Sequence, residues 1–430
     1  MGLSRLMLLL PLLLLVFTGA GPYARAEEEH PSSARVLLSR EESRLARLRM
    51  IRDETKEIRL ATYHFFLDDI GKDTLGMIVD ARKRGVKVKI ILDGMPVGLP
   101  KERAMMKALK DMGVEIKIYN PLFRYPHRAT FRNHMKSLIG SRALISGDRN
   151  VANPYFARRK SDKHLSIDME LEDPRALRDA TEHFDEFFQS TKMVSDPIGL
   201  VSDAEVESAR LELEAWSRSA LERFRPMRSL RKYSISNLRY VADVADPAVH
   251  SVSGMNQDIF AMIRRAKSSL VIMNPYISLT PELKKELTDA VARGVKIKII
   301  SNSSNVNNAK VMRFDWKETA PELVGMGIEV HEVDREAMLH AKTIVRDGVE
   351  VYVGSYNWDP RSQRLNVENG VIFDSEEISR VLNNYATRIR IFTNPVDLVD
   401  PATLTPAQKA ARCFRSNVRR LILAPIRPHI

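Results

Sequence analysis

The chain has 430 residues, a length that is enough for roughly two to three domains. Its hydrophobic content of 44% and its charged content of 28% are ordinary for a globular protein. Its formal net charge of +12 favours anionic partners such as phosphate-bearing lipids, nucleic acid or acidic surfaces, without choosing among them. A single cysteine, Cys413, excludes an internal disulfide.

The N-terminus has the pattern of a secretory signal peptide. A basic residue, Arg5, precedes an apolar stretch from Leu6 to Ala20 that is too short to span a bilayer comfortably. Ala24-Arg25-Ala26 matches the small-x-small cleavage pattern. We predict that residues 1–26 are a signal peptide, with an uncleaved anchor as the second interpretation. Both interpretations predict an exported protein, periplasmic or peripheral to the membrane of a bacterium.

The rest of the chain is organised as two halves that follow the same order. In the first half, expected strands at 57–66, 86–93 and 114–120 alternate with expected helices at 74–84 and 101–112, followed by a strand hairpin around His134 and a helix at 176–189. In the second half, strands are expected at 269–277, 295–301 and 328–333, with helices at 281–293 and ending at 321–326. Residues 81–91 match 290–300 almost residue by residue, and 112–118 match 326–332.

This alternation predicts an α/β fold, with two homologous α/β lobes packed as a pseudo-dimer and the active site between them. We expect a monomer with two pseudo-symmetric lobes. The predicted divisions are the signal peptide (1–26), an N-terminal helical segment (27–51), a first lobe (52–193), a helical linker with a basic run (194–253), a second lobe (254–393) and a basic amphipathic tail (394–430).

Two basic segments lie outside the repeats. The linker contains a charged amphipathic helix at 203–224, followed by Arg225, Arg228, Arg231 and Lys232, and is either a solvated linker or a basic lip that faces phosphate or membrane. The tail has no acidic residue after Asp400, and its apolar residues recur at helical spacing. It could lie in an anionic membrane interface or dock on the protein.

Each half contains one His-x-Lys pair, His134 with Lys136 and His340 with Lys342. Two residues apart on a strand, the imidazole and the ammonium point to the same face. Facing pairs would suit attack on a phosphodiester, because one imidazole can attack phosphorus while the other protonates the leaving alcohol and the ammonium groups stabilise the oxygens. This scheme requires no metal, and no other cluster has metal-ligand spacing, so we predict no cofactor.

The second pair lies in a longer motif. His340-x-Lys342-x4-Asp347, followed by Gly354-Ser355-x-Asn357, resembles the HKD motif of the phospholipase D superfamily. Residues 359–373 and 147–156 resemble the bacterial cardiolipin synthase-like subgroup of that superfamily. The resemblance covers roughly residues 50–395, and its motifs are more specific in the second half than in the first.

The resemblance implies roles for individual residues. His134 and His340 would be the nucleophile and the acid/base pair, and Glu368 would orient an active-site histidine, with Asp168 as its counterpart in the first half. A carboxylate behind an imidazole fixes its tautomer and stabilises its charged form. The residues implied to hold the phosphoryl oxygens are Lys136, Lys342, Asn150 and Asn357, and Asp347 completes the motif.

The first motif departs from the family pattern. Ser141 stands where the motif has Asp, and the distance from His134 to Asn150 is one residue shorter than that from His340 to Asn357. Because the histidine and the lysine survive, we expect the chemistry to be retained. We also expect the missing carboxylate to support the hairpin rather than the covalent step.

Other residues carry weaker signals. His64 is expected to be a core or rim histidine, and His164, His183 and His331 have no convincing partners in the sequence. Packing is the expected role of Trp216, Trp316 and Trp358. The residues Arg124, His127, Arg128 and Arg132 either line a phosphate entrance or form a solvated basic loop.

These patterns favour an exported phospholipid phosphatidyltransferase, most like a cardiolipin synthase, that works through a covalent phosphohistidine intermediate. Its partners would be phospholipid headgroups and an anionic membrane surface. If water were the acceptor, the same site would be a phospholipase D hydrolase. The same residues would also fit a metal-independent nuclease or a degenerate protein that binds anionic lipid, and nucleic acid is the less favoured partner.

Overall fold

The computed structural model describes residues 32–95, 100–121, 130–156, 163–190, 193–194, 200–226, 229–244, 254–334, 337–389, 393–396, 405–407, 410 and 414. The predicted signal peptide, the loop residues Arg124, His127 and Arg128, and most of the predicted tail lie outside these ranges. Within the described ranges, no helix is both long enough and apolar enough to cross a membrane.

The first half of the chain forms a sheet in the order β10-β4-β3-β2-β6-β7-β9-β1-β11. Strands β2, β3 and β4 are parallel, and the other pairings are antiparallel. The strands are β1 (Ser33–Leu37), β2 (Glu57–Thr62), β3 (Lys87–Asp93), β4 (Glu115–Tyr119), β6 (Ser137–Ile139), β7 (Leu144–Gly147), β9 (Asp168–Glu172), β10 (Met193–Val194) and β11 (Tyr233–Ser234).

The second half forms a sheet in the order β12-β20-β18-β17-β13-β14-β15-β21. Apart from β11, this is the order of the first sheet read from its other edge, so the predicted duplication and the α/β class are confirmed. The strands are β12 (Ser236–Ala242), β13 (Ser269–Met273), β14 (Lys296–Asn302), β15 (Glu329–Val333), β17 (Thr343–Arg346), β18 (Glu350–Gly354), β20 (Asn369–Asp374) and β21 (Thr393–Pro395).

The helices repeat in the same way, and their ends explain part of the sequence repeat. Helices α2 and α8 end just before Gly85 and Gly294, whose φ angles of 88° and 85° are the left-handed conformation that closes a helix. The chain then enters β3 or β14. The helices are α1 (Arg40–Asp53), α2 (Asp69–Lys83), α3 (Pro100–Asp111), α4 (Asn153–Phe156), α5 (Pro174–Gln189), α6 (Asp203–Arg223), α7 (Gly254–Arg265), α8 (Pro281–Ala292), α9 (Lys310–Gly325), α10 (Pro360–Arg364) and α11 (Glu376–Ile389).

The lobe boundaries differ from the predicted ones. The predicted helical segment at 27–51 contains strand β1, which pairs along its whole length with β9, so the first lobe begins with this strand. The predicted linker at 194–253 contains β12, which pairs with β20 as the edge of the second sheet. Both strands were missed because their apolar stretches are short, and only the pairing with β9 or β20 identifies them as strands.

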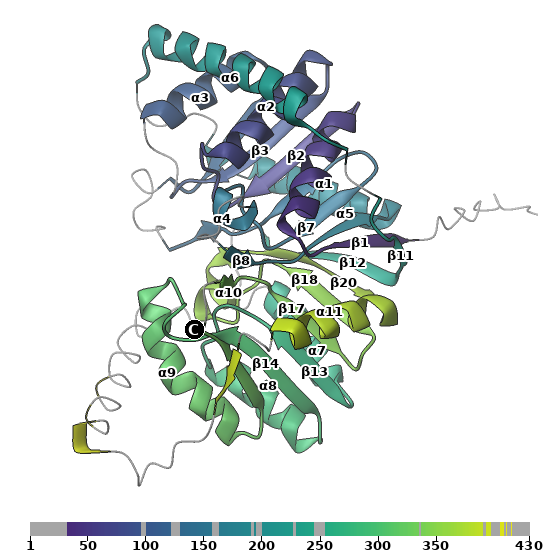
Figure 1. Ribbon diagram of the computed structural model, residues 1–430, viewed down its shortest axis with the longest axis vertical. Coiled ribbons are helices and arrows are strands. Elements are labelled where there is room, and N and C mark those ends of the chain that lie inside the picture. The colour runs from purple at the N-terminus through teal and green to yellow at the C-terminus, as the bar shows by residue number, and fades with distance from the viewer. Residues whose placement is uncertain are drawn as a thin grey trace, which may run out of the picture. The chain divides into compact units, whose positions relative to one another are not determined.

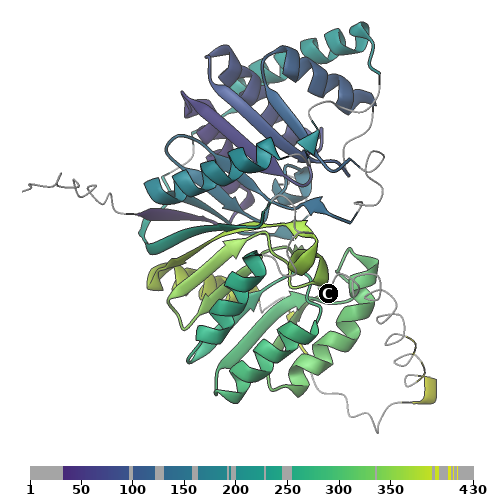
Figure 2. The ribbon, with the colours of Figure 1, turned by 180° about the vertical axis from the view of Figure 1, so that it is seen from behind.

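Helix α6 belongs to the first lobe rather than to a solvated linker. Its inner face buries Ala209, Leu213 and Ala220. Figures 1 and 2 show this helix beside α2 and α3. The approach to α2 is so close that a Cβ atom on Gly76 would collide with the backbone carbonyl of Trp216. We therefore assign α6 to the outer layer of the first lobe.

Two short parallel strand pairs join the halves, and each leads into a His-x-Lys pair. Strand β5 (Arg132–Asn133) pairs with β19 (Asn366–Val367), and β16 (Ala337–Leu339) pairs with β8 (Lys163–Leu165). The backbone N–H of His134 then donates to the carbonyl of Val367 at 2.9 Å, and that of His340 to the carbonyl of Leu165 at 2.8 Å. Each histidine is thereby fixed by the backbone of the other half.

Candidate active site

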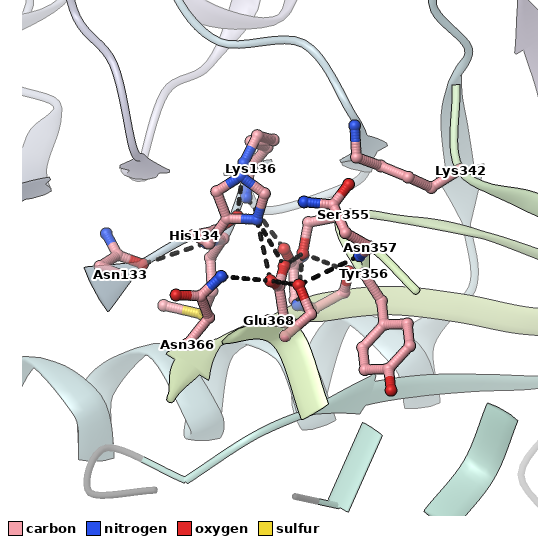
Figure 3. Close-up of polar contacts among 12 residues, drawn as sticks. Asn133, His134, Lys136, Lys342, Ser355, Tyr356, Asn357, Asn366 and Glu368 are labelled. Carbon is pink, nitrogen blue, oxygen red and sulfur yellow. Dashed lines mark hydrogen bonds and ion pairs between the residues drawn. The ribbon is translucent and has the colours of Figure 1, made fainter. Parts of the chain in front are cut away.

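His134 is paired with a carboxylate from the second half. Its Nδ1 atom lies 2.8 Å from Oε2 and 2.9 Å from Oε1 of Glu368, as Figure 3 shows. Glu368 also accepts hydrogen bonds from Ser355 Oγ at 2.5 Å and Ser362 Oγ at 2.6 Å. Burial raises the pKa of Glu368, but His134, Lys136 and the Ser355 hydroxyl outweigh it and hold that pKa below its ordinary value. Glu368 is thus an ionised partner for the imidazole, at the place expected of it.

His340 is paired with a carboxylate from the first half, in a mirror of the first arrangement. Its Nδ1 atom lies 2.9 Å from Oδ1 of Asp148, and Oδ2 of Asp148 accepts the backbone N–H of Ile167 at 2.7 Å. Asp148 was not among the residues predicted for the site. It stands at the position that matches Ser355 in the second half, two residues before the motif asparagine.

The expected role of Asp168 at His340 is wrong. Asp168 matches Glu368 in sequence, but its carboxylate accepts from Ser43 Oγ at 2.5 Å and from Arg47 at 2.8 Å instead. Its side chain is one methylene shorter than glutamate. Asp148 occupies the intervening place and donates its N–H to Oδ1 of Asp168 at 3.2 Å. Ser355 of the second half supports Glu368, which reaches His134. Asp148 of the first half stands at the position of Ser355 and reaches His340 directly.

The two lysines are buried beside the histidines. Lys136 Nζ donates to the carbonyl of His134 at 2.6 Å, and Lys342 Nζ to the carbonyl of His340 at 2.6 Å. Burial lowers the pKa of Lys136 to about 7 and that of Lys342 to about 8. Burial also lowers the pKa of His134 to about 4 and that of His340 well below its usual value. The site therefore holds neutral imidazoles beside ammonium groups that lose their charge near neutral pH.

The two motif asparagines differ in the hydrogen bonds that their side chains make. Asn150 uses both side-chain atoms within the chain, because Oδ1 accepts the His64 N–H at 3.1 Å and Nδ2 donates to Tyr155 Oη at 2.8 Å. Asn357 Oδ1, in contrast, is buried and has no hydrogen-bond partner among the described residues. Asn357 is the better placed of the two to interact with a ligand, whereas Asn150 positions its neighbours.

Four aromatic residues surround the histidines and were missed or undervalued from the sequence. Tyr155 Oη lies 3.5 Å from His340 Nε2, and the ring of His164 stacks on Tyr155 at 4.7 Å and lies 5.6 Å from His340. On the other side, Tyr63 meets the His134 ring edge-on at 5.3 Å, and His64 stacks on Tyr63 at 4.2 Å. Tyr63 and His64 directly follow β2, at the carboxyl edge of a parallel sheet, a location that could have identified them.

Two further histidines in the described ranges, His183 and His331, have partners of their own. His183 Nε2 lies 2.8 Å from the carbonyl of Asp243, and His331 Nε2 lies 2.6 Å from Glu329. Trp316 and Trp358 are buried core residues, in agreement with their predicted packing role. In the described ranges, no group of three or more His, Cys, Asp or Glu side chains could hold a metal ion.

Asp347, which was grouped with the catalytic residues, does not lie among the site residues. Its carboxylate accepts the backbone N–H groups of Lys267, Ser268 and Ser269 at 3.0, 2.8 and 2.9 Å. Although burial raises its pKa, these bonds hold the pKa of Asp347 well below its usual range. The motif aspartate therefore ties the β17–β18 hairpin to the start of β13, and its role is structural.

In the first half, another residue supplies the carboxylate that Ser141 lacks. The N–H and Oγ of Ser141 donate to Glu54 at 2.7 Å each, and Glu54 Oε1 accepts the N–H groups of Thr55 and Lys56 at 2.9 Å. Glu54 immediately follows α1 and precedes β2. In both halves a carboxylate therefore ties the hairpin to the connection that leads into the neighbouring strand. In the second half the hairpin supplies it as Asp347, and in the first half the connection between α1 and β2 supplies it as Glu54.

Asp148→Asn tests the newly identified partner of His340. It keeps the shape of the side chain but removes the charge that orients and stabilises the imidazole, so we expect kcat to fall by about 10²-fold or more. The change in KM should be smaller, because the substitution leaves the lysines in place. Steady-state kinetics and a melting curve would measure this. A normal kcat in Asp148→Asn together with a large loss in Asp168→Asn would contradict the assignment.

Comparisons with known proteins agree with the fold and the paired sites. Residues 48–189 and 259–390 match a family model described as cardiolipin synthase, phospholipase D-like domain. The chain is 26% identical to cardiolipin synthase C of Escherichia coli (strain K12) over 373 residues, covering 75% of this chain and 77% of that protein. It is also 26% identical to an uncharacterised protein of Helicobacter pylori (strain J99) over 418 residues, covering 86% and 80%. The crystal structure of phosphatidylserine synthase from Haemophilus influenzae Rd KW20 shares the fold, with a TM-score of 0.67 and 15% identity over 90% of this chain and 94% of that one.

Proposed function

Because the chain belongs to the cardiolipin synthase family with a phospholipase D-like domain, we propose that it transfers a phosphatidyl group from one phospholipid headgroup to the hydroxyl of another. The observation that carries this proposal is the reciprocal arrangement of the site. Each half contributes one imidazole, one buried ammonium group and the carboxylate that orients the imidazole of the other half.

The transfer would proceed in two steps. A carboxylate can only accept, so we assign the Nδ1–H of each imidazole as the donor to it, which leaves Nε2 to face the substrate. One imidazole is neutral, and its Nε2 attacks phosphorus and forms a P–N bond while the P–O bond to the headgroup breaks. The second imidazole is protonated at Nε2 when the anionic diester is bound, and it gives that proton to the leaving oxygen. The second imidazole then takes the proton of the acceptor hydroxyl, whose oxygen attacks phosphorus and breaks the P–N bond.

The surroundings of the histidines support both steps. Lys136 and Lys342 would stabilise the negative charge that builds up on the non-bridging oxygens, and the charge of the bound phosphodiester would favour protonation of the second imidazole. His340 is only 5% exposed, and both lysines are buried. Burial of these groups strengthens their electrostatic interaction with a bound phosphodiester.

We place the reaction at an anionic membrane surface outside the cytoplasm. The apolar segment before Ala24-Arg25-Ala26 supports export, and the net charge of +12 supports attraction to acidic phospholipids. The partner of the protein would then be the lipid surface itself.

One assay tests the reaction. The purified protein is incubated with vesicles of phosphatidylglycerol, with and without phosphatidylethanolamine and with and without EDTA, and the lipids are resolved. Cardiolipin formation that persists in EDTA supports the proposal. Phosphatidic acid as the product would instead mark the protein as a hydrolase. Tight vesicle binding with no product would point to the degenerate lipid-binding protein.

The lowered pKa values of the two buried lysines predict that the affinity for a phosphodiester anion depends on pH. A lysine is a cation below its pKa, so the charge on Lys136 is lost as pH rises through about 7 and that on Lys342 as it rises through about 8. The affinity for dimethyl phosphate, which stays a monoanion, should therefore fall roughly tenfold from pH 6.5 to pH 8.5. Isothermal titration calorimetry would measure this change, and Lys136→Met should flatten it near pH 7. An affinity independent of pH would contradict the prediction.

A further inference from the structure

We propose that Asp93 and Asn302 are the residues that position the two His-x-Lys segments, an inference that rests on the proposed function. Arg132 then serves as the counter-ion of Asp93 and not as a cation for the substrate phosphate. Asp93 ends β3 and Asn302 ends β14, and both side chains are fully buried. The register that matches residues 81–91 with 290–300 also matches these two residues with each other.

Both residues hold the backbone N–H that immediately precedes a site histidine. Asp93 Oδ2 accepts the N–H of Asn133 at 2.8 Å, and Asn302 Oδ1 accepts that of Leu339 at 2.8 Å. Successive N–H groups of an extended strand point to opposite sides, and the next one, on the histidine itself, donates to a carbonyl of the other half. Each segment is therefore held from both sides, by a side chain of its own lobe and by the backbone of the other lobe.

The two halves differ in the group that completes this contact. Asn302 Nδ2 donates to the carbonyl of Leu339 at 2.9 Å, so one amide serves both backbone groups of that residue. The carboxylate of Asp93 can only accept, and its Oδ1 accepts from Arg132 Nη1 at 3.1 Å. Arg132 lies two residues before its histidine, and the residue at that position in the second half is Met338, a buried apolar side chain. An Asp–Arg pair in one lobe thus takes the place of Asn with Met in the other.

The guanidinium of Arg132 is buried and already paired. Arg132 is only 1% exposed, and its Nη2 donates to the carbonyl of Asn120 at 3.0 Å. The solvated loop that the sequence allowed is therefore wrong for this residue. Burial raises the pKa of Asp93 to about 6, although the charge of Arg132 opposes the shift, so Asp93 is an anion at neutral pH. Withdrawal of Arg132 to bind a phosphate would leave that anion buried and unpaired.

Asp93→Asn combined with Arg132→Met copies the pairing of Asn302 with Met338 and tests the role of Arg132. Each single change leaves one buried charge without its partner, so we expect kcat to fall about tenfold or more in either. The double variant should recover kcat to within about threefold of the parent and should bind dimethyl phosphate within about twofold of it by calorimetry. Binding at least about tenfold weaker in a folded double variant would make Arg132 a phosphate ligand and overturn its assignment as a counter-ion.

Asn302→Leu tests the positioning role without changing a charge. It keeps the size of the side chain but removes its hydrogen bonds to the backbone before His340, so we expect kcat to fall about 10- to 100-fold with KM within about threefold. In protein labelled with ¹⁵N-histidine, the Nδ1–H resonance of His340 should shift or broaden, whereas that of His134 should stay in place. Leu323→Ala removes a buried core side chain on α9 of the same lobe and is the matched control. It should lower the melting temperature and leave both resonances and kcat unchanged.

The resonances and the affinity for dimethyl phosphate are measured without lipid turnover, which separates this inference from the proposed reaction. A folded Asn302→Leu variant with an unchanged His340 resonance and a normal kcat would overturn the positioning role. A shifted resonance in a protein that turns over no lipid would refute the proposed transfer and leave the positioning role standing. If the first double variant does not fold, the reverse exchange, Asn302→Asp with Met338→Arg, replaces it. There Met338→Arg should restore most of the kcat that Asn302→Asp alone removes, and a failure to restore it would overturn the pairing.

Discussion

His340→Ala should reduce kcat/KM for phosphatidyl transfer by at least about 1,000-fold, because the reaction then lacks either its nucleophile or its acid/base group. The fold should survive. The backbone N–H of residue 340 still donates to Leu165, and Asp148 keeps its hydrogen bond from Ile167. His134→Ala should have an effect of the same order, because the two imidazoles act as a unit. The measurement is steady-state kinetics on purified variants, together with circular dichroism and a thermal melt.

His331→Ala provides the matched control for this experiment. His331 lies on β15 and is paired with Glu329, outside the site, so its loss should leave turnover within about twofold of the parent. Double substitution of His134 and His340 should cost little more than either single change, as expected of groups that act together. Normal turnover in a folded His340→Ala variant would refute the proposed mechanism.

Glu54→Ala should lower the free energy of unfolding by about 2–4 kcal/mol, because it removes four hydrogen bonds to one ionised and largely buried carboxylate. The effect should be largely reversed by adding Ser141→Asp, since that change recreates the arrangement around Asp347 in the second half. With Glu54 still present, Ser141→Asp would place two carboxylates at the same N–H groups. It should then lower stability while changing activity only modestly.

Urea unfolding of the four proteins in this double-mutant cycle gives the coupling energy between the two positions. Asp53→Ala is the matched control, because Asp53 is the neighbouring residue and its ion pair with Arg52 is largely exposed. We expect its effect to stay within about 0.5 kcal/mol. If Glu54→Ala were no more destabilising than Asp53→Ala, or if Ser141→Asp failed to rescue it, the carboxylate exchange would be disproved.

The stability cycle also bears on whether the first motif is degenerate. The family pattern alone suggests a damaged copy, because Ser141 replaces the motif aspartate. The contacts of Asp347 show that this aspartate ties a hairpin to a neighbouring strand, and Glu54 makes the equivalent contacts in the first half. The departure at Ser141 is thus accompanied by a local replacement and gives no reason to expect a dead site.

Features that are encoded locally could be predicted from the amino-acid sequence alone. Alternating apolar strands and amphipathic helices predicted the α/β class, and the matched segments at 81–91 and 290–300 predicted the duplication. The two His-x-Lys pairs predicted the candidate site, and each of them does lie at a strand pair that joins the two halves. Glu368 was predicted from its motif context to pair with a histidine, and it does lie against His134.

The contacts between groups that are distant in the chain depend on the folded structure. Asp148 and His340 are 192 positions apart, and motif matching favoured Asp168 for that contact. The compensation of Ser141 by Glu54 was likewise invisible, because a carboxylate can reach the same N–H groups from either of two segments. Spacing in the sequence determines which side chains share a face of one strand or helix. Which carboxylate lies beside an imidazole depends instead on the length of its side chain, on its burial and on the backbone of the other lobe, and these are set only by the folded structure.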